Sequence, residues 1–356
     1  MKIGVEGIGW VTPFGSDPET ILRRLRAGER ASVVESPEPG GGGSAPRYHI
    51  PTPLPEGGAL RRMPRIRRSG AISYFGVSAG LAALEEAGLP VPPPEGTAVI
   101  FAICSGGVQY TRRLYEKIVE GGPAAASPLL FPETVHNAPA SHLAAALGID
   151  QESYTIIGDG TAGLAALHFA GELLACRPAL ERCVVVGSEE YDWILHEGYH
   201  TWRLCSREPC VRLHRKPPAG MLLGEGATAM VVRRPDPEKA LPTVEVATGS
   251  YGGRREAGAH LERLLGELPV TGSRLVVGSA NGTWIDHAEA AALRRFVPQA
   301  DPLYPKVAFG DPLGAGALMQ TGLAVLGLRE QGERRATVTS VGLNQLLAAA
   351  VVELPG

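Results

Sequence analysis

Short apolar runs rich in valine and isoleucine alternate with helix-like segments along most of the chain. In the first two thirds, the pattern predicts strands over residues 5–11, 98–103, 154–157, 183–186 and 227–232, and helices over residues 21–27, 73–87 and 138–147. Alternation of this kind is typical of α/β folds, in which helices cover the faces of a sheet. The sequence therefore predicts an α/β protein.

A second series of the same kind begins after the segment Arg-Arg-Pro-Asp-Pro. It consists of strands over 244–248 and 275–277, helices over 257–265 and 288–296, and a closing strand over 336–340. We therefore predict two similar halves, residues 1–235 and 236–356. The segment 312–328 interleaves leucines with Gly and Ala, which permit close backbone approach, so we expect it to form a central helix.

Residues 36–58 interrupt this pattern. They contain a run of four glycines and six prolines, which are poor formers of regular structure. We expect a surface loop or a disordered excursion here, outside the core.

Composition and charge narrow the class of protein. The 356 residues are 44% apolar, enough for one large core or two half-domains sharing an interface. Lys and Arg total 34 against 37 Asp and Glu, which favours neither nucleic acid nor a membrane surface as a partner. No apolar run reaches membrane-spanning length, and the start does not resemble a signal peptide. The five cysteines are an odd number, which fits reduced thiols better than a set of disulfides. We expect a cytoplasmic protein with reduced thiols, and no feature predicts a cofactor.

Residues 153–175 predict a buried strand, a glycine turn and a helix of small residues. Where a strand ends at a helix start, free backbone N–H groups and the helix dipole stabilise an anion, as an acyl-transfer nucleophile requires. Here that position is Gly160, which has no reactive side chain. We interpret the segment as the scaffold of an acyl-transfer site without its nucleophile.

Five further motifs, in order, carry a family resemblance: VEGIGWVTPFG at 5–15, GEGA at 224–227, ANGTWID at 280–286, KVAFGDPLGAG at 306–316 and SVGLN at 340–344. Together they resemble the β-ketoacyl-(acyl carrier protein) synthases of the thiolase-like fold, nearly end to end. The resemblance implies a five-layer αβαβα architecture with two pseudo-symmetric halves. It also implies a dimer formed along an edge strand, with residues 153–157 at or near the subunit interface.

The resemblance places the family's cysteine at Gly160, its first histidine at Asn281 and its second at Asp311, so all three are replaced. Asn281 can donate a hydrogen bond but cannot shuttle protons. Asp311 is expected to be an anion, which repels a malonyl carboxylate or an enolate. The family positions Glu225, Thr283 and Lys306 are retained, and we interpret them as scaffold and turn-holding groups.

Loss of the nucleophile from a covalent mechanism costs roughly a million-fold in turnover, which reduces about ten events per second to about one per day. Thr161 and Asp159 flank the turn as substitute nucleophiles, but nothing in the sequence places His136 or His142 beside Thr161 as a base. The pattern therefore favours a degenerate ketosynthase-like subunit that resembles a chain-length factor. Such a subunit pairs with an active ketosynthase, meets an acyl carrier protein and shapes the acyl tunnel.

Two other functions stay open. One is a divergent acyltransferase or malonyl-carrier decarboxylase with a non-cysteine site at Asp311, Asn281 or Thr161, because decarboxylation does not strictly require the cysteine. The other is a protein that sequesters acyl thioesters without turnover. The sequence leaves open whether the dimer is formed with a ketosynthase or with a second copy.

The remaining candidate residues are less suited to catalysis or metal binding. Cys104 follows a predicted core strand, which favours a small buried hydrophobe over a reactive thiol. A zinc set of His200, Cys205, Cys210 and His214 lacks the tight paired spacing of structural zinc sites, so we predict no metal.

The segment 60–68, LRRMPRIRR, contains five arginines. One interpretation is a solvated face or a set of intramolecular ion pairs. The other is a docking patch for an acidic carrier protein or a partner subunit, since steering needs clustered charge. The residues of this predicted patch are Arg61, Arg62, Arg65 and Arg67.

Overall fold

The computed structural model describes residues 1–37, 44–51, 60, 63, 66 and 69–356. Its main feature is a ten-stranded mixed sheet. The first five strands are β1 (Lys2–Val11), β4 (Thr97–Ile103), β5 (Ser153–Ile157), β6 (Arg182–Glu189) and β7 (Gly226–Arg233). The other five are β8 (Thr243–Ser250), β9 (Leu275–Val277), β10 (Asp301–Leu303), β11 (Arg335–Val341) and β12 (Leu346–Glu353).

The two groups of strands follow the same spatial order. From the outer edge inward, the first runs β5-β4-β6-β7-β1 and the second β10-β9-β11-β12-β8. In both groups the three outer strands are parallel and the two inner ones antiparallel. A short antiparallel pairing of β1 with β8 joins the groups. This repeat supports our proposal of two similar halves meeting near residue 235.

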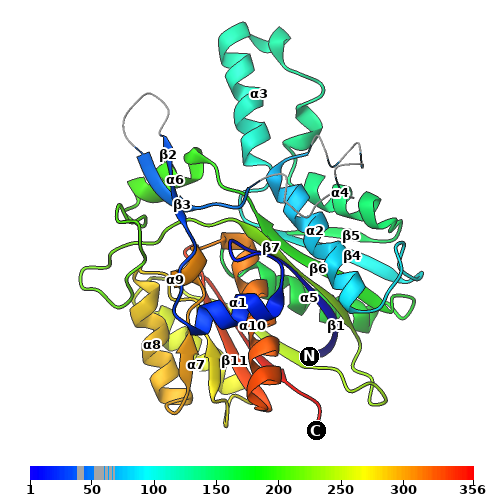
Figure 1. The fold of residues 1–356 in the computed structure, drawn as a ribbon, viewed down its shortest axis with the longest axis vertical. Coiled ribbons are helices and arrows are strands. Elements are labelled where there is room, and N and C mark those ends of the chain that lie inside the picture. The colour runs from blue at the N-terminus through cyan, green and yellow to red at the C-terminus, as the bar shows by residue number, and fades with distance from the viewer. Residues whose placement is uncertain (38–43, 52–59, 61–62, 64–65, 67–68) are drawn as a thin grey trace.

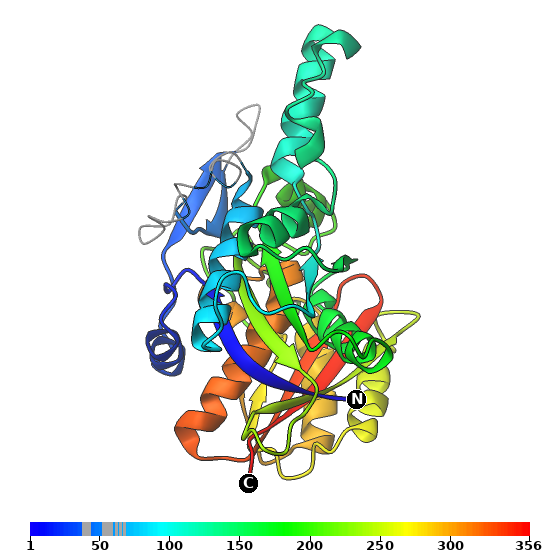
Figure 2. The same ribbon diagram turned by 90° about the vertical axis from the view of Figure 1, so that its right-hand side faces the viewer.

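Helices complete five layers (Figures 1 and 2). The helices α2 (Ala71–Glu86) and α4 (Ala138–Leu147) pack on the first group of strands, and α7 (Ala257–Glu267) and α8 (Ile285–Phe296) pack on the second. Between the groups lie α5 (Ala162–Cys176) and α10 (Gly316–Gln331), each of which contacts strands of both. The expected α/β architecture with layers αβαβα is confirmed.

The predicted central helix is also confirmed, although its first turn is the separate 3₁₀ turn η5 (Leu313–Ala315). Small residues bring α5 and α10 together, because a Cβ at Gly163 would lie 2.6 Å from the backbone nitrogen of Leu318. On α10, Gly322 leaves room for the ring of Trp10, which a Cβ would strike. These contacts explain why glycine and alanine alternate with leucine here.

Two expectations were wrong. Within the segment expected to be a loop, β2 (Val33–Pro37) and β3 (Ser44–Tyr48) form an antiparallel pair, and Tyr48 and Ile50 are buried in the core. Residues 38–43 and 52–58 of that segment lie outside the described residues. The strand over 336–340 does not close the second series, because β12 follows it and pairs with β11 and β8.

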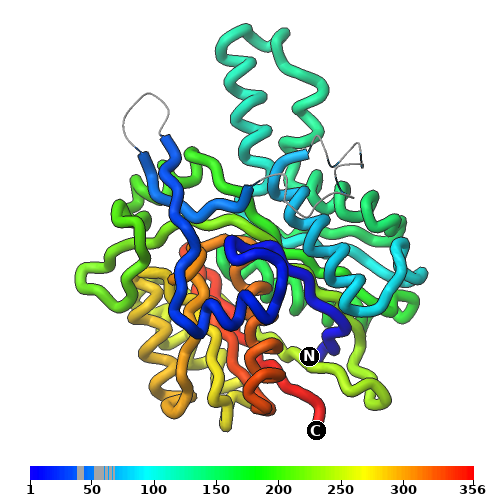
Figure 3. Tube along the Cα trace, in the orientation of Figure 1, coloured from blue at the N-terminus to red at the C-terminus, as the bar shows by residue number. Residues whose placement is uncertain are grey.

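The helix expected over 21–27 is α1 (Pro18–Arg26). Three helices were not predicted: α3 (Val108–Gly121), α6 (Trp193–Thr201) and the short α9 (Lys306–Phe309). The α3 segment projects from the body of the molecule and returns through two 3₁₀ turns, η3 (Pro123–Ala125) and η4 (Phe131–Glu133) (Figure 3). Leu114 is the one buried residue of α3. Among the described residues, no helix is long and apolar enough to cross a membrane.

Candidate functional site

Gly160 lies in the buried turn between β5 and α5. A Cβ at this position would meet the Nζ atom of Lys306 at 3.5 Å, an ordinary van der Waals distance. The carbonyl oxygen of Gly160 accepts a hydrogen bond from the hydroxyl of Ser340 on β11 (2.9 Å). The turn is therefore anchored to the second group of strands, and its open side faces an ammonium group.

Lys306 and Asp311 form a buried ion pair beside this turn. The Nζ atom of Lys306 lies 2.9 Å from Oδ2 of Asp311, and the two side chains are 2% and 3% exposed. The same Oδ2 accepts a hydrogen bond from Nδ2 of Asn281 (2.8 Å), and Oδ1 accepts one from the amide of Leu313 (3.0 Å). Hydrogen bonds of this kind are what a buried charge pair needs to offset its desolvation.

Asn281 is held in one orientation. Its Oδ1 accepts hydrogen bonds from the hydroxyl (2.7 Å) and the amide (3.2 Å) of Thr283, so its Nδ2 is left to donate toward Asp311. Its own backbone amide donates to Oδ1 of Asp286 (2.9 Å), near the start of α8. We call Gly160, Asn281, Lys306 and Asp311 the buried centre. It offers hydrogen-bond donors and a carboxylate paired with an ammonium group, but none of its four residues carries an acyl-accepting thiol or hydroxyl.

Asp159 is the partner of Thr161 that sequence reasoning missed. Its Oδ1 accepts from both the hydroxyl and the amide of Thr161 (3.0 Å each), and its Oδ2 accepts from the amide of Asn344 (2.8 Å). A carboxylate that already accepts three hydrogen bonds is a weak base for activating a hydroxyl. Of the two histidines considered earlier, His142 is paired with Glu133. This arrangement indicates a turn-holding role for Asp159 and Thr161.

Cys104 follows β4 and also lies near the buried centre. Its Sγ is 3.8 Å from the hydroxyl of Tyr199, and its amide donates to Glu189 (2.8 Å). Burial and the nearby carboxyl of Glu189 raise the pKa of the Cys104 thiol far above its ordinary value. Because the thiolate is the nucleophilic form, Cys104 is poorly suited to attack a thioester.

Glu189 and Glu190 are buried carboxyls at the end of β6 that sequence reasoning did not single out. Glu189 accepts hydrogen bonds from the amides of Cys104, Ser105 and Gly314 and from the Ser105 hydroxyl. Burial raises the pKa of each carboxyl to about 7. The signal was available in the sequence, because two consecutive glutamates directly follow a run of apolar strand residues.

Glu225 holds the hairpin of β2 and β3 against the body of the molecule. Its carboxylate contacts Nδ1 of His49 (2.5 Å), the amide of Ile50 (2.7 Å) and the guanidinium of Arg47 (3.4 Å). These contacts support the proposed scaffold role for this residue. The four arginines of the predicted docking patch, Arg61, Arg62, Arg65 and Arg67, lie outside the described residues.

The four residues considered for zinc are used differently. His200 and Cys205 line a surface cavity, Cys210 contacts Glu208 (3.9 Å), and the amide of His214 donates to Asp286 (2.9 Å). Across the part of the chain that the structure describes, no three His, Cys, Asp or Glu side chains gather in a way that could hold a metal ion.

Comparison with known proteins points to one family. The family model for the β-ketoacyl synthase N-terminal domain matches residues 1–237. A 3-oxoacyl-[acyl-carrier-protein] synthase 2 from Vibrio cholerae is 24% identical over 361 residues, covering 93% of this chain and 86% of the relative.

Two solved structures share the fold. A β-ketoacyl synthase from Burkholderia phymatum superposes with a TM-score of 0.82 at 16% identity, and each chain is covered completely. The ishigamide ketosynthase/chain length factor superposes with a TM-score of 0.81 at 17% identity, covering 100% of this chain and 99% of the other. The five-layer architecture is therefore the thiolase-like one.

Proposed function

The chain belongs to the β-ketoacyl synthase family, and from that premise we propose that it is a non-catalytic subunit of the chain-length-factor type. In this proposal it pairs with an active ketosynthase in type II fatty acid, polyketide or aryl-polyene synthesis. Its contribution is to stabilise that partner and to shape the acyl tunnel with side chains near the turn at Gly160. An acyl carrier protein delivers the growing chain to the pair.

The observation that carries the proposal is the composition of the buried centre. Gly160, Asn281 and Asp311 occupy the positions that the family resemblance assigns to the cysteine and the two histidines. Nζ of Lys306 and Nδ2 of Asn281 are both committed to the carboxylate of Asp311. Of the alternative nucleophiles, Thr161 is hydrogen-bonded to Asp159, and the pKa of the Cys104 thiol is raised, which keeps it protonated. A centre of this composition lacks a group that could accept an acyl chain covalently.

Exposed apolar side chains and an open sheet edge support the proposed partner. On the projecting α3 segment, Val119 is 83% exposed and Phe131 is 62% exposed. Ile157, on the edge strand β5, is 57% exposed, and β5 has β4 as its one neighbour in the described sheet. Exposed large apolar side chains and an open sheet edge are typical of surfaces that another protein covers.

Co-expression with a ketosynthase encoded beside this chain tests the proposal. We expect the two proteins to co-purify, and we expect the variant V119E/F131E to lose the partner because it places charge at two exposed apolar positions of the projecting segment. The matched control is Leu346→Glu on β12, where an apolar side chain is 40% exposed and outside the projecting segment. Failure of the wild-type chain to co-purify, together with a stable homodimer, contradicts the heteromeric proposal.

A second candidate function is decarboxylation of a malonyl carrier. It is suggested by the two donors of the buried centre, Nζ of Lys306 and Nδ2 of Asn281, which in this reaction would release Asp311 and donate to the enolate oxygen. In that reaction malonyl-carrier loses carbon dioxide and the enolate takes a proton to give acetyl-carrier. Turnover by the pure chain that Asp311→Ala abolishes while the variant stays folded supports the decarboxylase, whereas absence of acetyl-carrier supports the non-catalytic subunit.

A further inference from the structure

The α3 segment, which runs from Val108 to Glu133, is joined to the body of the molecule by few apolar contacts. Leu114 is the one buried residue of α3, and Figures 1 and 2 show the helix standing clear of the sheet layers. Just before the segment, Gly106 takes a left-handed backbone conformation (φ 65°). Because most of the stability of a helix in a protein comes from packing of an apolar face, the position of this segment depends on polar contacts at its base.

Glu190, which follows β6 and is 1% exposed, fastens the start of α3. Its Oε1 accepts a hydrogen bond from the amide of Gln109 (3.3 Å), and its Oε2 accepts one from the amide of Ile72 on α2 (3.1 Å). The side-chain amide of Gln109 donates to the carbonyl oxygen of Tyr191 (2.9 Å). One buried carboxyl therefore ties the first turn of α3 to α2, which packs on the sheet.

The groups that face Glu190 do not neutralise it. Three titratable side chains lie around its carboxyl: Glu189, Glu225 and Tyr110. The nearby cations of the β2–β3 hairpin, Arg47 and His49, are paired with Glu225, and no cation among the described residues forms an ion pair with Glu190. Burial, together with the two neighbouring glutamates, raises the pKa of Glu190 to about 7.

The returning end of the α3 segment is fastened by His142 of α4. Nε2 of His142 lies 3.0 and 2.9 Å from the two carboxylate oxygens of Glu133, in η4. The side chains of His142 and Glu133 are 13% and 20% exposed, so water screens the contact only in part. Tyr110 faces Glu133 from α3. The contact is an ion pair when the imidazole is protonated and a single hydrogen bond when it is neutral.

Protons act on both contacts in the same direction. Loss of the Glu190 proton leaves a carboxylate buried beside two other carboxyl groups, and opening of the segment relieves this state by admitting water. Loss of the His142 proton removes the charge that attracts Glu133. We propose that Glu190 and His142 form a proton-controlled latch, which holds the α3 segment on the body when both are protonated and releases it as the pH rises.

Release of the segment changes how its exposed apolar side chains, Val119 and Phe131 among them, are presented to the surroundings. A further contact at the base joins the guanidinium of Arg112 to the carboxylate of Asp192 (3.0 Å), so the segment stays attached to the chain at its hinge. The inference does not rest on the proposed function, because every group of the latch belongs to this chain.

Amide hydrogen exchange of the pure full chain at about pH 5.5 and about pH 7.5, with rates corrected for intrinsic base catalysis, tests the latch. A carboxyl whose pKa is about 7 when latched and 4.5 when open makes the opening equilibrium about twentyfold larger at the higher pH. We therefore expect corrected exchange over residues 105–115 to accelerate roughly tenfold or more. The central helix α5, which reports global unfolding, should show no comparable change.

Two variants and a matched control separate the latch from a general effect of charge. Glu190→Gln keeps a carbonyl acceptor that does not titrate, and it should reduce the response to about threefold or less. His142→Gln, at the less buried contact, should lower the response by about twofold. The matched control Glu120→Gln removes an exposed carboxyl near the far end of α3 and should respond as the wild type does.

The proposal is overturned if corrected exchange in α3 changes with pH no more than exchange in α5, or if either latch variant responds as Glu120→Gln does. These measurements use the chain without a ketosynthase. Failure of the latch is therefore distinguishable from failure of the proposed function, which co-purification tests.

Discussion

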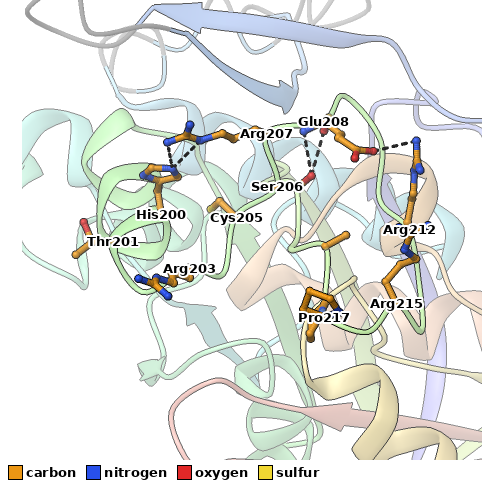
Figure 4. A pocket seen from close by; sticks show the side chains of 12 residues that line it. His200, Thr201, Arg203, Cys205, Ser206, Arg207, Glu208, Arg212, Arg215 and Pro217 are labelled. Atoms are coloured by element: carbon orange, nitrogen blue, oxygen red, sulfur yellow. Dashed lines mark hydrogen bonds and ion pairs between the residues drawn. The ribbon is translucent and has the colours of Figure 1, made fainter.

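The buried centre and the surface cavity lined by Arg203, Arg207, Arg212 and Arg215, here called the basic cavity (Figure 4), treat charge in opposite ways. In the buried centre Lys306 is neutralised by Asp311, and each polar atom of Asn281's amide has a hydrogen-bond partner. In the basic cavity Arg203 and Arg215 are without a partner among the described residues, and both are exposed. The difference indicates that the charges of the buried centre are compensated within the chain, whereas those of Arg203 and Arg215 are left to solvent.

The largest effect should come from breaking the ion pair of the buried centre. Asp311→Ala leaves the ammonium of Lys306 buried and uncompensated, so we expect a loss of about 3–5 kcal/mol in the free energy of unfolding. Urea denaturation measures this. The double variant K306M/D311L removes both charges and should be considerably more stable than Asp311→Ala. Equal stability of Asp311→Ala and the wild type would show that the region is not closed by this pair.

Glu189, beside the buried centre, makes stability depend on pH. Its pKa is raised from 4.5 to about 7, so the folded chain holds a proton that the unfolded chain has released. The unfolding free energy should therefore fall as pH rises from about 4.5 to about 7, by roughly 3 kcal/mol for this group alone. Denaturation curves across that range measure the slope, which should become shallower in Glu189→Gln. A slope unchanged in that variant would exclude Glu189 as its source.

The smallest effects on stability should come from the basic cavity. Glu208→Ala removes an exposed partner of Arg212, a loss of about 0.2–1 kcal/mol. R203A/R215A should change the free energy of unfolding by no more than about 0.5 kcal/mol, because neither side chain has a structural contact to lose. Thermal melts of these variants beside Asp311→Ala sharpen the contrast. A large loss of unfolding free energy in R203A/R215A would show that these arginines stabilise the fold.

Sequence reasoning correctly predicted the elements that have a clear pattern of apolar and polar residues. The segments 275–277 and 138–147 appear in the structure with the expected bounds, because each is an apolar segment set off clearly from the turns on either side of it. It missed β12, whose run Leu-Leu-Ala-Ala-Ala-Val-Val is buried on both faces and shows no period of two. It missed the β2–β3 hairpin because glycines and prolines hid the buried Tyr48 and Ile50.

The candidate site, like the fold, was predicted only in part. The family resemblance selected Gly160, Asn281, Lys306 and Asp311 from distant parts of the chain, and the structure brings these residues together. Whether they are the replaced catalytic positions stays a prediction. The pairing of Lys306 with Asp311 was not foreseen, and it changes the expected electrostatics because the ammonium offsets the anion. Contacts between segments far apart in sequence are set by tertiary packing, which local pattern does not encode.

The most direct test of a missing nucleophile is the intact mass of the pure chain after incubation with an acyl-carrier thioester. A side chain at residue 160 has space beside Lys306, so Gly160→Cys serves as the matched control that restores a thiol at that position. We predict that the wild-type mass stays unchanged and that the Gly160→Cys mass increases by one acyl group. An acyl adduct on the wild-type chain, at Thr161, Cys104 or any other residue, would contradict the account.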